Sequence, residues 1–173
     1  MSATQPHERL RALDDVREAP LHIVLVEPEI PPNTGNVARL CAATGCALHL
    51  VEPLGFRIDD RELKRAGLDY WDALGVVMHP SLDAFLEATA QKRRWFFSTR
   101  AKRAYTQAAF QSGDMLVFGR ETKGLPQAVL EHEPEQALRI PMRPDSVRSI
   151  NLSTAAGIVT YAALAAIGFP GLQ

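Results

Sequence analysis

The sequence predicts an α/β fold with a mainly parallel sheet flanked by helices, and two observations support this prediction. Short apolar runs of strand length alternate with segments of helical character from residue 21 to residue 168. The first run, LHIVLVEP at 21–28, is apolar at nearly every position, as expected for a strand buried on both faces. Ligands of such sheets bind beyond the carboxyl ends of the strands, so the loops there deserve the closest reading.

The individual elements follow from apolar runs and from capping residues. We expect strands at 21–28, 47–53, 75–79, 94–99, 114–119 and 137–142. A helix capped by Asn33 or Thr34 should end at Gly45, and a second helix should start after the N-cap Ser81 and run over 81–91. Further helices are expected at 59–67, at 125–133 with Pro126 in its first turn, and at 151–168.

Composition indicates one globular domain. The chain has 173 residues, of which 46% are hydrophobic, and this is enough to build a core. We assign the domain to residues 21–173 and treat residues 1–20, where charges are mixed without an apolar stripe, as a mobile N-terminal extension. The net charge of −1 excludes a global basic field, so any nucleic-acid surface must come from local clusters.

Cysteine usage and hydropathy predict a cytoplasmic protein. Cys41 and Cys46 lack the partners of a metal site, so we expect no metal and two reduced, buried thiols. No signal peptide is expected and no membrane partner, because the most apolar stretch, 151–168, is interrupted by polar residues.

Three loops after strands are unusual. The loop at 28–39 combines two prolines, Asn33, Gly35 and Arg39; it is either a well-capped helix start or a binding turn. The loop at 119–126, GRETKGLP, lacks the Lys-Ser or Lys-Thr of a phosphate loop, and no G-x-G-x-x-G occurs in the chain. The loop at 141–153 is stiffened by two prolines and can present main-chain groups to a ligand, or it is a plain polar linker.

Taken together, NTGNVARLCAATG, LVFGRETKGLP and IPMRPDSVRSINLSTAAGIV resemble the three motifs of the SPOUT methyltransferases, most closely the small TrmL (YibK) type. The resemblance extends over roughly residues 21–172. It implies transfer of a methyl group from S-adenosylmethionine to the ribose 2′-hydroxyl of the wobble nucleotide, cytidine or uridine 34, in tRNA anticodon loops. It also implies a SPOUT (alpha/beta knot) fold with a C-terminal trefoil knot, and a homodimer. General topology rules alone would argue against a knot.

The resemblance also assigns site residues. Those associated with catalysis are Asn33, Arg39, Glu121 and Asn151. Those expected to bind the cofactor are Ser98, Thr99, Gly119, Ile140, Met142, Ser149 and Leu152. The chain departs from the motifs at Arg120, where proline is frequent, and in the loop DSVRSIN, which is one residue longer than its common form.

The chemistry limits the role of Arg39. A guanidinium stays protonated, so we interpret Arg39 as a cation that stabilises the developing alkoxide or orients the ribose, while a phosphate or water takes the proton. We expect Glu121 to fix Arg39 or a backbone turn.

Two clusters of basic residues indicate an RNA partner, and the C-terminal helix indicates a second subunit. Contact with RNA phosphates is expected from two clusters of cations, one formed by Arg57, Arg61, Lys64 and Arg65 and the other by Lys92, Arg93, Arg94, Arg100, Lys102 and Arg103. Tyr70 and Trp71 could stack on an anticodon base or belong to the core. The helix at 151–168 is apolar on nearly every side, which favours burial against a second subunit. Two alternative functions are methylation of another tRNA position or of rRNA, and RNA binding without catalysis.

Overall fold

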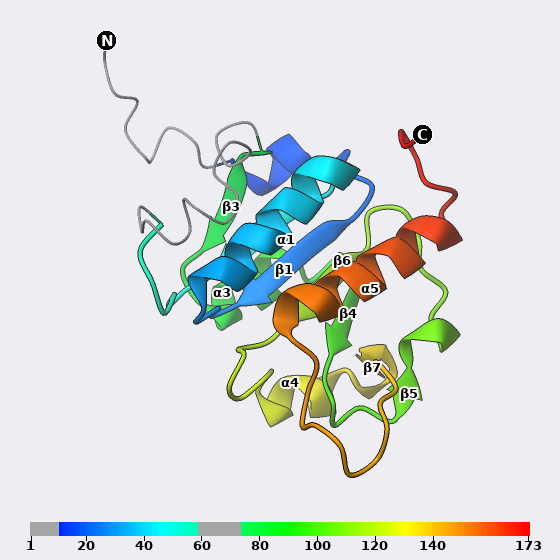
Figure 1. The fold of residues 1–173 in the computed structure, drawn as a ribbon. Helices are drawn as coiled ribbons and strands as arrows, with labels where there is room; N and C mark the ends of the chain where they lie inside the picture. Colours follow the sequence, from blue (N-terminus) through cyan, green and yellow to red (C-terminus); the bar gives the residue numbers. More distant parts are fainter. Residues whose placement is uncertain (1–10, 59–73) are drawn as a thin grey trace.

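Within residues 11–58 and 74–173, which this computed structural model describes, seven parallel strands form one sheet (Figure 1). Their order in the sheet is β3-β2-β1-β6-β4-β7-β5. The strands are β1 (His22–Val26), β2 (Ala47–Val51), β3 (Val76–His79), β4 (Arg94–Phe97), β5 (Arg103–Ala104), β6 (Met115–Phe118) and β7 (Ala137–Arg139). The parallel α/β sheet confirms the predicted fold class, while the trefoil knot stays a prediction.

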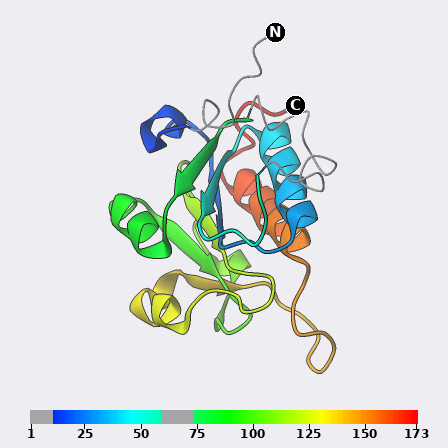
Figure 2. The same cartoon turned by 90° about the vertical axis from the view of Figure 1, so that its left-hand side faces the viewer.

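Helices cover both faces of the sheet. Helices α1 (Pro31–Thr44) and α5 (Leu152–Ala166) lie side by side on one face, and α3 (Leu82–Ala88) and α4 (Gln127–His132) lie on the other (Figures 1 and 2). Three short 3₁₀ helices complete the described elements: η2 (Leu13–Val16), η3 (Tyr105–Gln107) and η4 (Pro134–Gln136).

Strand β1 is apolar at successive positions because both of its faces are buried. Ile23 and Leu25 belong to the core cluster on the side of α1 and α5, which also contains Val37. Val24, on the opposite face of the strand, belongs to the cluster that contains Phe85 of α3. Side chains of a strand alternate between faces, so a strand with helices on both sides is apolar at every position.

Several predicted boundaries are confirmed. Gly45 ends α1 in the left-handed conformation with φ of 73°. The Ser81 hydroxyl accepts the Ala84 N–H at 3.1 Å and caps α3. Asn151 caps α5 by accepting the N–H groups of Ser153 and Thr154. These caps are local, so their signals are readable in a few residues.

Other boundaries were predicted wrongly. Helix α1 starts at Pro31, and Asn33 and Thr34 are buried inside it instead of capping it. Pro126 is the N-cap of α4 and precedes its first turn. The sixth expected strand stops at Arg139, before the prolines that follow, and β5 was missed because two residues carry no periodicity. The helix expected at 59–67 lies outside the described residues.

The segment just before the predicted domain, residues 11–20, packs against the domain. Residues 11–20 belong to the segment expected to be a mobile extension, yet Val16 is buried together with Ala47 and Val77. Cys41 and Cys46 are free and buried, as predicted, and burial raises the pKa of both thiols. Among the described residues, no helix is both long and apolar enough to cross a membrane.

Candidate functional site

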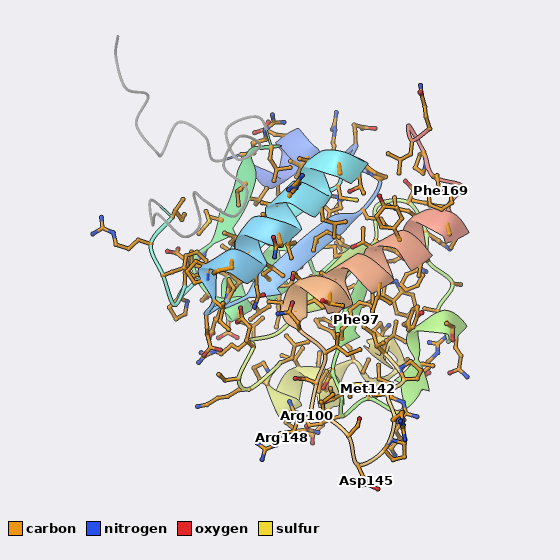
Figure 3. All side chains as sticks on the ribbon, viewed as in Figure 1. Phe97, Arg100, Met142, Asp145, Arg148 and Phe169 are labelled. Carbon is orange, nitrogen blue, oxygen red and sulfur yellow. The ribbon has the colours of Figure 1, made fainter. Side chains whose placement is uncertain are left out.

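A cavity of about 320 Å³ lies beyond the carboxyl ends of four adjacent strands, β1, β6, β4 and β7. Its walls come from the start of α1, from residues 97–100, 118–124 and 140–152, and from the first turn of α5. Figure 3 shows Phe97, Arg100, Met142 and Arg148 gathered near the start of α5, with Phe169 at the far end of that helix. The position is the one expected for a ligand site in a parallel sheet, and the volume falls in the range of small-molecule sites.

The cavity brings most of the predicted site residues together. All of the residues predicted to bind the cofactor line it, namely Ser98, Thr99, Gly119, Ile140, Met142, Ser149 and Leu152. Asn33, Glu121 and Asn151 line it as well. Arg39 does not; it lies on an exposed part of α1. The roles of these residues stay predictions, but the three loops do converge on one space.

A chain of hydrogen bonds links the three loops at this cavity. Asn33 Nδ2 donates to Glu121 Oε1 at 3.2 Å, and Asn33 Oδ1 accepts from Asn151 Nδ2 at 3.0 Å. Asn151 Oδ1 in turn accepts from the first turn of α5. The side chain of Asn33 therefore has its donor and its acceptor both engaged, which fixes its amide orientation between the two neighbouring loops.

Glu121 holds the turn that precedes α1. Its carboxylate accepts the Glu29 N–H at 2.8 Å and the Ile30 N–H at 3.0 Å. Helix α1 has no side-chain cap of its own, and its first two residues are prolines, which have no N–H to offer. A carboxylate at a helix N-terminus also interacts favourably with the helix dipole. The expectation that Glu121 fixes a backbone turn is confirmed.

Gly119 has a structural reason to be glycine. A Cβ atom at this position would lie 2.1 Å from the carbonyl carbon of Gly124 and 2.2 Å from the Leu125 nitrogen. The loop folds back on itself here, with a bridge between Arg120 and Gly124. The absent side chain thus makes room for the returning loop.

One wall of the cavity is apolar. The rings of Phe97 and Phe118 stack with centroids 4.9 Å apart, at the carboxyl ends of β4 and β6. Ile140, Met142 and Leu152 add aliphatic surface from the loop after β7 and from α5. Apolar walls combined with main-chain and hydroxyl groups suit a nucleoside better than an ion.

Four cations line the same cavity, and the sequence analysis had not grouped them. They are Arg100, Arg120, Lys123 and Arg148. Arg120 forms an ion pair with Glu27, and Arg100 donates to Gln127 Oε1 at 2.9 Å. These cations could have been assigned to the site from the sequence, because each lies in or beside one of the loops that form it.

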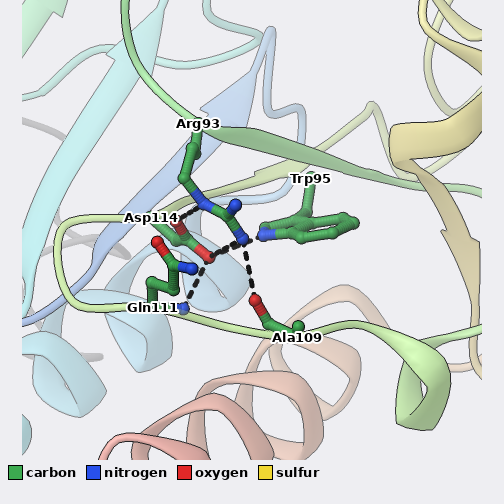
Figure 4. A network of polar contacts seen from close by, with 5 residues as sticks. All are labelled: Arg93, Trp95, Ala109, Gln111 and Asp114. Carbon is green, nitrogen blue, oxygen red and sulfur yellow. Dashed lines mark hydrogen bonds and ion pairs between the residues drawn. The ribbon is translucent and has the colours of Figure 1, made fainter.

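The predicted basic cluster at 92–103 is not one free patch. The Arg93 guanidinium donates to Asp114 at 2.8 Å and to the Ala109 carbonyl at 2.7 Å (Figure 4). Arg94 pairs with Glu133, and Arg103 donates to the carbonyl of Glu135. These three arginines bind the protein itself. Of the other cluster, Arg57 is exposed, while Arg61, Lys64, Arg65, Tyr70 and Trp71 lie outside the described residues.

Three buried histidines form a row that the sequence did not reveal. His22 Nδ1 lies 2.9 Å from His49 Nε2, and His49 Nδ1 lies 3.1 Å from His79 Nε2. Burial and the positive charge of Lys92 lower the pKa of His22 to about 4. Burial, together with the charges of both neighbours, lowers the pKa of His49 well below its usual value, and burial lowers the pKa of His79. All three imidazoles are therefore neutral near pH 7.

The described residues offer no cluster of three or more histidine, cysteine, aspartate or glutamate side chains suited to hold a metal ion. The histidine row is no exception, because its ring nitrogens are within hydrogen-bonding distance of one another.

The fold and the site define an α/β protein with a cavity of small-molecule size at the carboxyl edge of a parallel sheet. The chain belongs to the SpoU rRNA methylase family, whose model matches residues 20–161. This agrees with the resemblance carried by the three loop motifs.

Curated relatives match over nearly their whole length. A tRNA (cytidine(34)-2′-O)-methyltransferase of Saccharophagus degradans is 52% identical over 151 residues, which cover 87% of this chain and 97% of the relative. The protein of the same name from Escherichia coli strain K12 is 52% identical over 152 residues, covering 87% of this chain and 96% of that one.

Solved structures agree on the fold. A structure that concerns 2-OH methylation of C/U34 on tRNA is 49% identical, with a TM-score of 0.77, and the match covers 83% of this chain and 93% of that chain. The SpoU methyltransferase AviRb from Streptomyces viridochromogenes, solved in complex with AdoMet, has a TM-score of 0.78 at 22% identity over 90% of this chain and 64% of that one. At that identity the second likeness concerns the fold alone.

Proposed function

We propose that this protein transfers a methyl group from S-adenosylmethionine to the ribose 2′-hydroxyl of nucleotide 34, a cytidine or uridine, in the anticodon loop of tRNA. The observation that carries the proposal is the single cavity where the three motif loops meet. The identity to two tRNA (cytidine(34)-2′-O)-methyltransferases over most of the chain supports the choice of substrate. We place the reaction in the cytoplasm.

The residues of the cavity fit S-adenosylmethionine. When bound, the cofactor supplies the methyl group and the leaving group. Phe97, Phe118 and Met142 provide apolar surface for the adenosine part, and the hydroxyls of Ser98, Thr99 and Ser149 can hydrogen-bond to its polar groups. The loops at 119–124 and 140–151 contribute residues to the walls of this space.

The chain's own contribution to the reaction is positioning and charge. Asn33, held between Glu121 and Asn151, offers a fixed amide at the edge of the cavity, where the ribose would enter. The Arg39 guanidinium stabilises the alkoxide that develops on the 2′-oxygen, while a neighbouring phosphate or water takes the proton. Holding the two reacting groups in line can lower the barrier by about 7–11 kcal/mol.

The proposal includes a homodimer. Arg39 stands on an exposed part of α1, away from the cavity of its own chain. The neighbouring helix α5, which contains no charged residue, carries Tyr161, whose exposed fraction is 48%. A second copy packed on α1 and α5 would cover this surface and would bring Arg39 of one subunit toward the cavity of the other.

A second candidate is 2′-O-methylation of rRNA. The matching family is the SpoU rRNA methylase family, so the fold alone does not choose between RNA classes. The full-length match to tRNA enzymes favours tRNA.

A methylation assay tests the proposal. Purified protein is incubated with unmodified tRNA and S-adenosylmethionine, and nuclease fragments are weighed by mass spectrometry. We expect a mass increase of one methyl group on the fragment that holds nucleotide 34, and none with Arg39→Ala at normal cofactor affinity. Methylation at another position, methylation of rRNA alone, or an Arg39→Ala variant active within a few-fold would overturn the corresponding assignment.

A further inference from the structure

We propose that Glu29, which does not line the cavity, is a positioning residue for methyl transfer because it locks the β1–α1 loop onto the β6–α4 loop. This inference rests on the proposed function. It assigns to Glu29 the task of holding Asn33 and Glu121 at the place where the ribose enters.

The contact between the two loops runs in both directions. The Glu29 main-chain N–H donates to Glu121 Oε2 at 2.8 Å, while the Glu29 carboxylate accepts the Thr122 N–H at 3.0 Å. The same carboxylate accepts the Thr122 hydroxyl at 2.9 Å. Each loop therefore supplies one carboxylate and at least one N–H donor to the other, across more than 90 residues of sequence.

A neighbouring ion pair extends the contact. Arg120, two residues before Thr122, pairs with Glu27, two residues before Glu29. Glu27 adopts a positive φ of 50°, which is uncommon for a residue with a side chain and indicates that the surrounding contacts hold this turn firmly.

The other side of Glu29 is held by a close backbone approach. A Cβ atom at Gly55 would lie 2.8 Å from the Glu29 Cα and 3.1 Å from its carbonyl oxygen. The Gly55 N–H donates to the Pro28 carbonyl at 2.9 Å. Glu29 is thus fixed between the segment at Gly55 and the loop that carries Thr122, so its main chain has little freedom to shift.

The position of Glu29 controls residues that do reach the cavity. Through Glu121, which it contacts by its own N–H, it is linked to Ile30 and Asn33. Glu121, Thr122 and Asn33 line the cavity, whereas Glu29 does not. Most of the residues assigned to cofactor binding lie on other loops. Loosening the contact should therefore disturb the alignment of the ribose more than the affinity for the cofactor.

The test compares Glu29→Ala, Glu29→Gln and Thr122→Val with the control Glu131→Ala. Glu131 is an exposed carboxylate that accepts one hydrogen bond, from Gln127 at 3.1 Å, and does not line the cavity. For each protein we would measure kcat and KM on tRNA, the Kd of S-adenosylmethionine by calorimetry, and the thermal midpoint.

We expect Glu29→Ala to lower kcat about tenfold and to leave the cofactor Kd within about threefold, because small misplacements near the reacting groups are costly. Glu29→Gln, which keeps one acceptor oxygen for Thr122, should recover part of that loss. Thr122→Val removes a single hydroxyl and should lower kcat about threefold. Glu131→Ala should match the wild type.

The contrary outcomes separate two failures. An active wild type with an equally active Glu29→Ala variant overturns this inference alone, and so does a kcat that falls only in proportion to the folded fraction. A wild type that leaves nucleotide 34 unmodified overturns the proposed function and this inference with it. If Glu29→Ala does not fold, Thr122→Val decides by the same criteria.

Discussion

The two ends of strand β6 carry carboxylates in very different settings. Asp114, just before the strand, is buried and accepts from Arg93 at 2.8 Å, from the Trp95 indole N–H at 2.7 Å and from the Gln111 N–H (Figure 4). Glu121, beyond the other end, accepts main-chain and amide N–H groups and lines the cavity. The first carboxylate is paired with a cation, whereas the second lines the cavity.

This difference separates structure from function within one strand. At the amino end the polar groups bind one another and close a gap between β4, β6 and the 109–111 segment. At the carboxyl end the polar groups hold three loops around a space large enough for a small molecule. We therefore expect changes at the amino end to alter stability and changes at the carboxyl end to alter turnover.

The largest effect should come from Asp114→Asn. The substitution removes the charge that pairs with Arg93 and leaves the indole N–H of Trp95 or the Gln111 N–H without a full acceptor. We expect the free energy of unfolding to fall by about 3 kcal/mol, as is typical when a buried, hydrogen-bonded charge is lost. Urea unfolding measures this change. A twofold or greater change in kcat of the folded variant would contradict the expectation that the amino end of β6 affects stability and not turnover.

Acid should lower the stability of the fold through the row formed by His22, His49 and His79. Burial lowers the pKa of His22 to about 4, whereas an unfolded histidine titrates near 6.5. The unfolded chain then binds more protons than the folded one in this window, so stability is present above about pH 6.5 and is lost as pH falls toward 4. We expect His22 alone to account for a loss of about 2 kcal/mol at about pH 5. Urea unfolding at pH 7 and at pH 5 measures this loss. The free energy of unfolding of His22→Asn should fall less between these two pH values than that of the wild type.

Glu121→Gln should have the reverse profile of Asp114→Asn. The amide can still accept one N–H but presents its own NH₂ to the second donor, so the turn before α1 loosens. We expect kcat to fall about tenfold and the free energy of unfolding to fall by about 1 kcal/mol. Steady-state kinetics with saturating cofactor measure the first quantity. Full turnover in the variant would show that the cavity end tolerates loss of this contact.

The smallest effect should distinguish two lysines. Lys123 lines the cavity at the carboxyl ends of the strands, whereas Lys92 precedes β4 at the amino ends of the strands. Lys123→Ala should weaken tRNA binding about threefold and reduce its salt dependence by about one phosphate contact, while Lys92→Ala changes neither. Filter binding across a salt series measures both. A stronger effect at Lys92 would place the RNA at the amino end.

The sequence predicted what depends on local signals. The cap at Ser81, the end of α1 at Gly45, the start of α5 near residue 151 and the buried strand β1 each follow from a few adjacent residues. The three loops of the site were found from their motifs, and the structure places them around one cavity.

Features built by distant residues could not be predicted in the same way. The turn before helix α1 is held by Glu121, about 90 residues further along the chain, so the group that caps this helix cannot be found in the neighbouring sequence. The histidine row needs the lateral order of β1, β2 and β3, which periodicity does not give. The pairing of Arg93 and Arg94 within the protein could not be predicted for the same reason, because Asp114 and Glu133 are distant in sequence.

A crystal structure of this protein with S-adenosylhomocysteine tests the central claim most directly, namely that the carboxyl-end cavity is the methyl-donor site. We predict that the ligand lies between the Phe97 and Phe118 rings and the loop at 140–151, in contact with Ser98, Gly119 or Ser149. Density at the amino end of the sheet, or no binding at millimolar ligand, would contradict the account.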